Sequence, residues 1–193
     1  MNIEEAEAYV FEKLEESLSD TLFYHGVHHT VDVSNAALQI AIAEGIHDKE
    51  TLLLLQTAAL YHDLGFISTY KGHEEEGCRL ARVSLPNFDY TDEQIEKICG
   101  LIMATRVPQA PANHLEEILA DADLDYLGRD DFWPISDSLY KELNKRELVT
   151  DTDTWNKLQI EFLQNHQYWT KTAQQWRQPN KLKRIEELKG MIK

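Results

Sequence analysis

Residues 48–66, DKETLLLLQTAALYHDLGF, contain the stretch of sequence that decides the fold. Up to Leu64 the side chains are apolar nearly all round a helical wheel, which is typical of a central, buried helix. Gly65 follows and is expected to end that helix. His62 and Asp63 then lie at the end of a buried helix, where polar side chains are costly unless they have partners. A bound cation would satisfy both side chains, since imidazole and carboxylate are metal ligands.

Helical periodicity also dominates on both sides of this stretch. Thr91 with Gln94, and Asn113 with Glu116, have the spacing of capping residues at the start of a helix. Alternating strand patterns are nearly absent. We therefore expect an all-α fold, a helical bundle, with helices at residues 3–18, 27–44, 48–64, 72–84, 91–102, 113–127 and 136–146, and one or two more from residue 153 onward.

The length of 193 residues fits one domain better than two. We expect a single domain over residues 1–193, with the functional site in a core of residues 23–128 and C-terminal helices, residues 129–193, packing on that core. Two cysteines without paired spacing argue against a disulfide framework and against a zinc site of thiolates.

The composition restricts the partners of the chain. The net charge is −15, from 19 Lys and Arg against 34 Asp and Glu. Such a surface repels duplex nucleic acid and anionic membranes, whose binding depends on neutralising phosphates. A small anionic substrate stays compatible with it, because a metal supplies positive charge locally. The N-terminal segment lacks secretory features and no apolar run is long enough to span a membrane, so we expect a cytoplasmic protein.

A further histidine lies in a predicted helix among residues typical of a core. His29, from the segment YHGVHHTVDV, shares a helix face with Val33, Ala37 and Ile40. His25 lies one helical turn earlier and reaches the same cavity if that turn is already helical. A single histidine on an apolar face is more often a core residue than a ligand, so these positions gain weight only together with His62.

The run ADADLDYLG supplies carboxylates on the predicted sixth helix, at Asp121, Asp123 and Asp125. Asp123 lies on the flank of the apolar face that Leu127 widens, whereas the other two aspartates lie on the opposite flank. A helical wheel therefore favours Asp123 as a ligand. Runs of this kind are usually solvated or form calcium loops, but calcium requires more oxygen ligands in a flexible loop than a helix with intervening leucines provides.

The order of these motifs resembles the HD superfamily of metal-dependent phosphohydrolases. The resemblance extends over about residues 23–128 and depends on three separated motifs: the histidine segment, HD preceded by ALY and followed by LGF, and the DAD run. It implies an all-helical bundle in which a divalent metal is bound by His29, His62, Asp63 and Asp123. The spacing from the DAD run to the following glycine is one residue shorter than in some relatives, so the first aspartate of that run stays an alternative ligand.

The resemblance also implies roles beyond the four ligands. His73 resembles a histidine that approaches the metal cavity, or binds a second metal, in some branches, and Glu74 would support it. His25 matches the position of the proton donor to the leaving group in cyclic-nucleotide phosphodiesterases of the superfamily. The alternatives are an ordinary surface histidine for His73 and a histidine at the start of a helix for His25.

One departure from the family narrows the expected chemistry. Where branches with two metals, including diiron oxygenases, have further histidines on the fifth helix, this chain has LIMATRVP. Thr105 and Arg106 stand there instead, which favours one metal per chain. Arg106 is a candidate phosphate clamp, because a guanidinium group offers paired donors to phosphate oxygens. Lys71 and Thr105 are further candidate substrate-binding residues, and ordinary surface positions are the alternative for the two cations.

We therefore expect a metal-dependent phosphohydrolase, a phosphomonoesterase or phosphodiesterase, that cleaves a phosphate ester of a nucleotide with a metal-activated water. Two imidazoles and two carboxylates suit Mn²⁺, Fe²⁺, Co²⁺, Ni²⁺ or Zn²⁺. His73 or His25 would protonate the leaving oxygen. The alternatives are a regulatory or binding HD protein with a structural metal, and a diiron oxygenase. A homodimer is compatible with the sequence.

Overall fold

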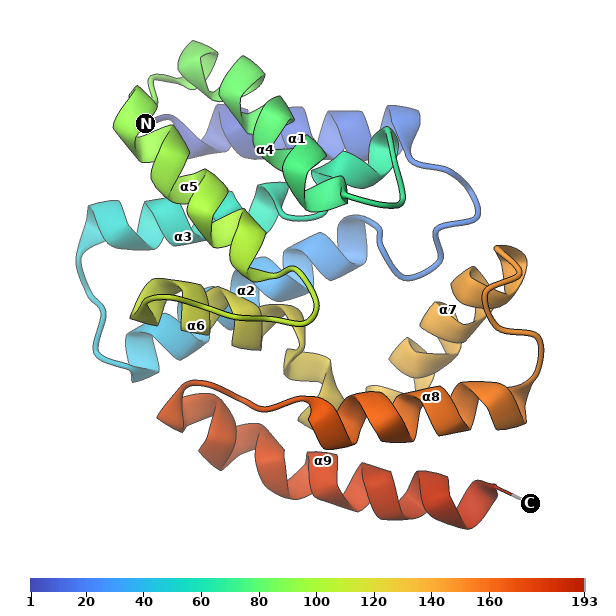
Figure 1. Ribbon diagram of the computed structural model, residues 1–193. Coiled ribbons are helices and arrows are strands. Elements are labelled where there is room, and N and C mark those ends of the chain that lie inside the picture. Colours follow the sequence, from blue (N-terminus) through green and yellow to red (C-terminus); the bar gives the residue numbers. More distant parts are fainter. Residues whose placement is uncertain (193) are drawn as a thin grey trace. The chain divides into compact units, whose positions relative to one another are not determined.

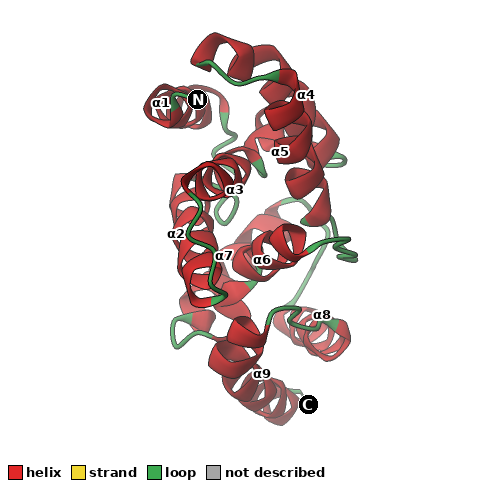
Figure 2. Ribbon diagram, turned by 90° about the vertical axis from the view of Figure 1, so that its left-hand side faces the viewer, coloured by secondary structure: helices red, strands yellow, loops and turns green. Residues whose placement is uncertain are grey.

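The computed structural model describes residues 1–192, and every regular element in this part of the chain is a helix (Figures 1 and 2). The all-α class predicted from the sequence is confirmed. The residues form two compact units: unit 1 comprises Met1–Ser19 and His25–Asp123, and unit 2 comprises Asp20–Tyr24 and the chain from Leu124 onward. The single domain expected from the sequence stays a prediction. Within residues 1–192, none of the helices has both the length and the hydropathy of a membrane span.

Unit 1 is built round α3 and α2, which pack against each other (Figure 1). α2 also contacts α6, α3 contacts α1 and α5, and α4 packs on α5. The elements of this unit are α1 (Ile3–Ser17), α2 (Val27–Ala43), α3 (Lys49–Tyr61), the 3-10 helix η1 (Leu64–Ile67), α4 (His73–Ser84), the 3-10 helix η2 (Leu85–Phe88), α5 (Asp92–Ala104) and α6 (His114–Asp123).

The predicted helix starts in unit 1 are formed by side chains that cap free backbone N–H groups. Thr91 and Gln94 make a complete capping box at the start of α5. The Oδ1 atom of Asn113 accepts hydrogen bonds from the N–H groups of Leu115 and Glu116, each at 3.1 Å, at the start of α6. Both capping pairs recognised in the sequence therefore act as caps.

α3 is buried along most of its length, as its apolar sequence predicts, with Leu55, Ala58 and Tyr61 fully enclosed. The helix ends at Tyr61, three residues before the predicted end, and η1 follows. A Cβ atom on Gly65 would lie 1.9 Å from the carbonyl oxygen of His73. The glycine is therefore required because η1 passes directly against the first residue of α4.

The predicted end of α6 at Leu127 is wrong. The α-helix ends at Asp123, because Leu124 has φ −106° and ψ 17° and so leaves the helical conformation. A 3-10 helix, η3 (Asp125–Gly128), follows and belongs to unit 2. The helical wheel drawn for the sequence was therefore valid up to the last residue of α6 but not beyond it.

Unit 2 has its own core, in which α9 packs against α8 and η3. Its long helices are α7 (Phe132–Lys145), α8 (Thr152–Asn165) and α9 (Lys171–Met191). α7 starts four residues before the predicted position. Its first turn contains Pro134, which is tolerated there because the first N–H groups of a helix have no partner within it. The buried apolar residues of this core are Tyr24, Leu124, Tyr126, Leu127, Phe132, Leu163, Tyr168, Ala173, Ile185 and Leu188.

Candidate metal centre

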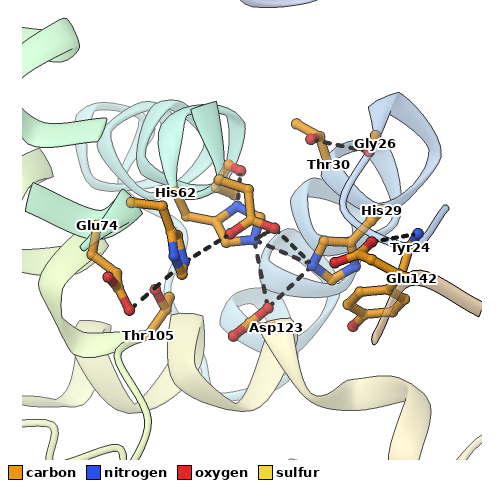
Figure 3. Close-up of polar contacts among 12 residues, drawn as sticks. Tyr24, Gly26, His29, Thr30, His62, Glu74, Thr105, Asp123 and Glu142 are labelled. Carbon is orange, nitrogen blue, oxygen red and sulfur yellow. Dashed lines mark hydrogen bonds and ion pairs between the residues drawn. The ribbon is translucent and has the colours of Figure 1, made fainter. Parts of the chain in front are cut away.

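Four polar side chains converge inside unit 1 from three helices. His29 belongs to the first turn of α2, His62 and Asp63 follow directly after α3, and Asp123 is the last residue of α6. Figure 3 shows His29, His62 and Asp123 pointing toward one another. The two histidines and Asp63 are buried. The packing of α2 on α3 and on α6 therefore brings together residues that are far apart in the sequence.

The donor atoms of these side chains form a tight group. The Nε2 atoms of His29 and His62 lie 3.3 Å apart. Asp63 Oδ2 lies 3.4 Å from His29 Nε2 and 3.2 Å from His62 Nε2. Asp123 Oδ1 lies 3.2 Å and 3.5 Å from the same two nitrogens. Ligands that each lie about 2.0–2.2 Å from one ion have about this separation. The spacing of His29, His62 and Asp123 therefore fits a single first-row divalent cation, and Asp63 Oδ2 lies equally close to the two imidazole nitrogens.

The hydrogen bonds of His62 prepare its ring for metal binding. Its Nδ1–H group donates to the carbonyl oxygen of Ala59 at 2.7 Å, which orients Nε2 toward His29 and the two carboxylates, where it would bind a metal on losing its proton. Metal-binding histidines commonly fix their other ring nitrogen in this way. Asp63 Oδ2 is buried and accepts no hydrogen bond from the described residues. His29, His62 and Asp123 thus form a cluster that could hold a metal ion, and Asp63 directs a fourth donor toward it.

The electrostatics of the cluster favour a cation. Burial alone would lower the pKa of His62, but the carboxylates of Asp63 and Asp123 outweigh it and hold that pKa well above 6.5. Burial likewise opposes the ionisation of both aspartates, but the pKa of Asp63 is held far below its usual range by His62, and that of Asp123 is lowered to about 2 by hydrogen bonds from His29 and His62. Both carboxylates are therefore anionic at neutral pH and attract positive charge.

Two further histidines flank this centre. His73, the first residue of α4, places Nε2 3.5 Å from Asp63 Oδ1 and 3.6 Å from Glu74 Oε1. Its Nδ1 lies 3.4 Å from the carbonyl oxygen of Tyr70. The turn that contains His25 is not helical, since α2 starts after Gly26. The His25 ring nevertheless lies 6.0 Å from the ring of His29 and 6.4 Å from that of His73.

The three carboxylates of the DAD run and its extension have different surroundings. Asp123 belongs to the donor group described above, whereas Asp121 is fully buried on α6 and is not part of that group. Asp125 lies in unit 2, where its Oδ1 atom accepts a hydrogen bond from Nε of Arg177 at 2.6 Å. The structure therefore brings Asp123, and not Asp121, to the two histidines.

Two of the three candidate substrate-binding residues have local partners. Thr105 is buried, and its hydroxyl group donates to the carbonyl oxygen of Ile102 at 2.8 Å. Arg106 is half-exposed and forms an ion pair with Glu75, with 2.5 Å between Nη2 and Oε1. Lys71 is exposed. Glu75 belongs to the first turn of α4 together with His73, so the ion pair holds the Arg106 guanidinium beside that turn.

Two aromatic residues to which the sequence assigns no role lie against the flanking histidines. The Phe66 ring centroid is 4.2 Å from that of His25 and 3.9 Å from that of His73. Tyr70 contacts the edge of Phe66, with centroids 5.3 Å apart. In the sequence, Phe66 stands out only as the aromatic residue that follows HDLG. Its contact with His25 depends on packing against the loop before α2, which is distant in the sequence.

Comparison with known proteins places this arrangement in a family. Residues 26–125, just over half of the chain, match the HD domain. A crystal structure of a predicted HD superfamily hydrolase from an uncultured Thermotogales bacterium has a similar fold, with a TM-score of 0.65 and 21% identity over 98% of this chain and 90% of the other. No curated protein matches the chain. The matched residues include His29, His62, Asp63 and Asp123, and the chain belongs to the HD domain family.

Proposed function

We propose that this chain is a metal-dependent phosphohydrolase that cleaves a phosphate ester, with a nucleotide as substrate. The observation that carries the proposal is the group of His29, His62, Asp63 and Asp123, in which one oxygen of each carboxylate lies 3.2–3.5 Å from the two imidazole nitrogens and those nitrogens lie 3.3 Å apart. Borderline imidazole and hard carboxylate donors suit Mn²⁺, Fe²⁺, Co²⁺, Ni²⁺ or Zn²⁺, at one ion per chain. When bound, such an ion supplies Lewis-acid chemistry toward a phosphoryl oxygen and toward water.

The remaining steps fall to side chains beside the ligands. His73 uses Nδ1 to donate to the Tyr70 carbonyl oxygen, so its Nε2 atom faces Asp63, where it can hold a proton and give it to a leaving oxygen. Glu74, buried beside it, orients that nitrogen. His25 is the second candidate proton donor. Arg106 would bind the phosphate group by exchanging its contact with Glu75 for paired phosphate oxygens.

The substrate class follows from charge. A net charge of −15 disfavours duplex nucleic acid, whereas a small anion can be attracted locally by a cation and by Arg106. We place this activity in the cytoplasm and in a single HD domain. The competing function is a regulatory or binding protein with a structural metal, which is favoured by the near-complete burial of His62 and Asp63.

The test is metal analysis and phosphatase assay of the wild type, His62→Ala and Asp63→Ala, with bis-p-nitrophenyl phosphate and a nucleotide panel as substrates. We expect about one metal per wild-type chain and a loss of metal and activity in both variants. The matched control is His114→Ala, since His114 is an exposed histidine of unit 1 that pairs with Glu117.

Tightly bound metal without turnover on any substrate would support the regulatory protein and contradict the phosphohydrolase. Two irons per chain would support an oxygenase instead. A wild type that binds no metal while the variants lose only stability would show that the polar cluster is structural.

A further inference from the structure

We propose that Phe66 is a positioning residue that fixes the imidazole rings of His25 and His73 beside the metal centre. The inference rests on the proposed function, in which these two histidines hold and transfer protons. It concerns how the fold sets the orientation of two rings from separate segments, His25 from the loop before α2 and His73 from the start of α4.

Phe66 contacts both rings with its aromatic system. The interplanar angle is 18° with His73, at a centroid distance of 3.9 Å, and 30° with His25, at 4.2 Å. The two imidazoles are farther from each other, at 6.4 Å, than either is from Phe66. Phe66 therefore lies between them as a shared stacking surface. Both centroid distances are below the range of about 4.5–7 Å that is typical of aromatic pairs.

The orientation of both rings depends on the groups that pack against them. Rotation of an imidazole about its Cβ–Cγ bond has broad, shallow preferences, so neighbouring atoms must select the orientation. His25 precedes α2, whose N-cap, Gly26, has extended backbone angles. The bond between His73 Nδ1 and the Tyr70 carbonyl oxygen is long, at 3.4 Å. Phe66 places its ring against both imidazoles and so limits their rotation.

The Phe66 ring is itself fixed in position by its surroundings. Its side chain is buried, with 7% of its surface exposed, and Tyr70 packs edge-on against it. The preceding residue, Gly65, approaches the carbonyl oxygen of His73 so closely that no Cβ atom would fit. The backbone that carries Phe66 is thus fixed against the backbone that carries His73.

The test compares Phe66→Leu, which stays apolar but has no ring, with Phe66→Tyr, which keeps the ring. In the leucine variant we expect unchanged metal content, a fall in kcat of about 10- to 100-fold and a KM within about twofold, because small misplacements of reacting groups have effects of this size. In the tyrosine variant we expect kcat within about threefold of the wild type. Phe88→Leu is the matched control, since the Phe88 ring packs against Tyr9.

A second readout does not depend on activity. NMR spectra of the metal-free protein should show the imidazole ¹⁵N resonances of His25 and His73, assigned with single His→Gln variants, moving in Phe66→Leu by more than the lost ring current of Phe66 accounts for, because the rings change their orientation and hydrogen bonds. They should stay in place in Phe88→Leu. Phe66→Met provides a second ringless variant if the leucine variant does not fold, because methionine fills irregular spaces.

Imidazole resonances that move by no more than the lost ring current in folded Phe66→Leu or Phe66→Met would overturn the proposal, as would moved resonances with a wild-type kcat. A kcat loss matched by Phe88→Leu would overturn it too, because the effect would then be general. If the wild type shows no phosphatase activity while the resonances move as expected, the proposed function fails, but the positioning of the two rings by Phe66 is supported.

Discussion

Asp121 and Asp123 show how much the surroundings of one residue type differ within a single helical turn. Asp121 is fully buried on α6 and is separate from the donor group, whereas Asp123 Oδ1 lies within 3.5 Å of both histidine nitrogens. The sequence favoured Asp123 only through its flank on a helical wheel. The structure adds that α6 ends there, which places the carboxylate at the end of the helix that packs on α2.

At this scale we predict opposite consequences for the two aspartates. Asp123→Asn should weaken metal binding by at least about 10-fold, since even residues that only support a ligand cost 10- to 100-fold when they are removed. Asp121→Asn should keep metal affinity but lower the free energy of unfolding by about 1–3 kcal/mol, because it changes a buried polar group. Metal titration and denaturant unfolding of both variants provide the measurements. A loss of affinity in Asp121→Asn alone would make Asp121 the ligand.

The residue scale also shows the limit of prediction from sequence. His29, His62 and Asp63 could be selected because they occur in helices that are otherwise apolar, where polar groups require partners. Phe66 and Tyr70 could not be selected, because an aromatic side chain beside a motif is most often part of a core. Their proximity to His25 arises only when the loop before α2 packs against η1.

At the scale of elements, the contact between η1 and α4 determines where His73 and Glu74 lie. Gly77, one turn into α4, approaches the end of α3 closely, because a Cβ atom there would lie 3.0 Å from the carbonyl oxygen of Tyr61. Together with Gly65, it allows α4 to lie directly against the segment that carries the His-Asp pair. The sequence indicated both α3 and α4. How closely α4 lies against the segment that carries the His-Asp pair depends on Gly65 and Gly77, which have no side chains.

We predict that Gly65→Ala lowers the free energy of unfolding by about 2 kcal/mol or more, since the added methyl group meets a backbone atom that cannot rotate away. The displacement of α4 should also reduce activity through His73. The matched control is Gly100→Ala in α5, where the nearest atom to the new Cβ is Glu116 Oε1 at 3.8 Å and where alanine favours the helix. Chemical denaturation of both variants measures the difference. Equal stability of the two would contradict the close approach of η1 to α4.

At the scale of the whole molecule, a metal at the proposed site would couple binding to folding, because the four proposed ligands come from α2, from the end of α3 and from α6. Any ion that binds only the folded chain stabilises it by mass action, by about 2.7 kcal/mol at 100 times its Kd. The helical class and most helix positions could be predicted from periodicity, as could the capping pairs. The division into two units could not, because the boundary after Asp123 lies within an otherwise continuous helical pattern.

We predict that added Mn²⁺ or Ni²⁺ raises the Tm of the wild type by about 5–10 °C, and not that of His62→Ala. The increase should be larger near pH 8 than near pH 6. The pKa of His62 is raised in the folded chain, so its protonation stabilises the metal-free fold fully below the ordinary value of 6.5 and less as the pH rises through the folded-state pKa. A metal must displace that proton at low pH. Thermal unfolding at both pH values tests this, and a larger increase at pH 6 would contradict it.

The boundary between the two units has a consequence for dividing the protein. His25 is the first residue of unit 1 after the chain leaves Tyr24, and Asp123 is its last before Leu124. One joint is therefore a peptide bond of Asp123, a proposed metal ligand, and the other is a peptide bond of His25, which flanks the candidate site. Cutting the chain after Asp123 would create an α-carboxylate on the proposed ligand, and starting it at His25 would put an ammonium group on a residue that flanks the site. Recombination or fusion at these boundaries would thus alter the charge of the centre itself, so exchangeable segments have to begin inside unit 2.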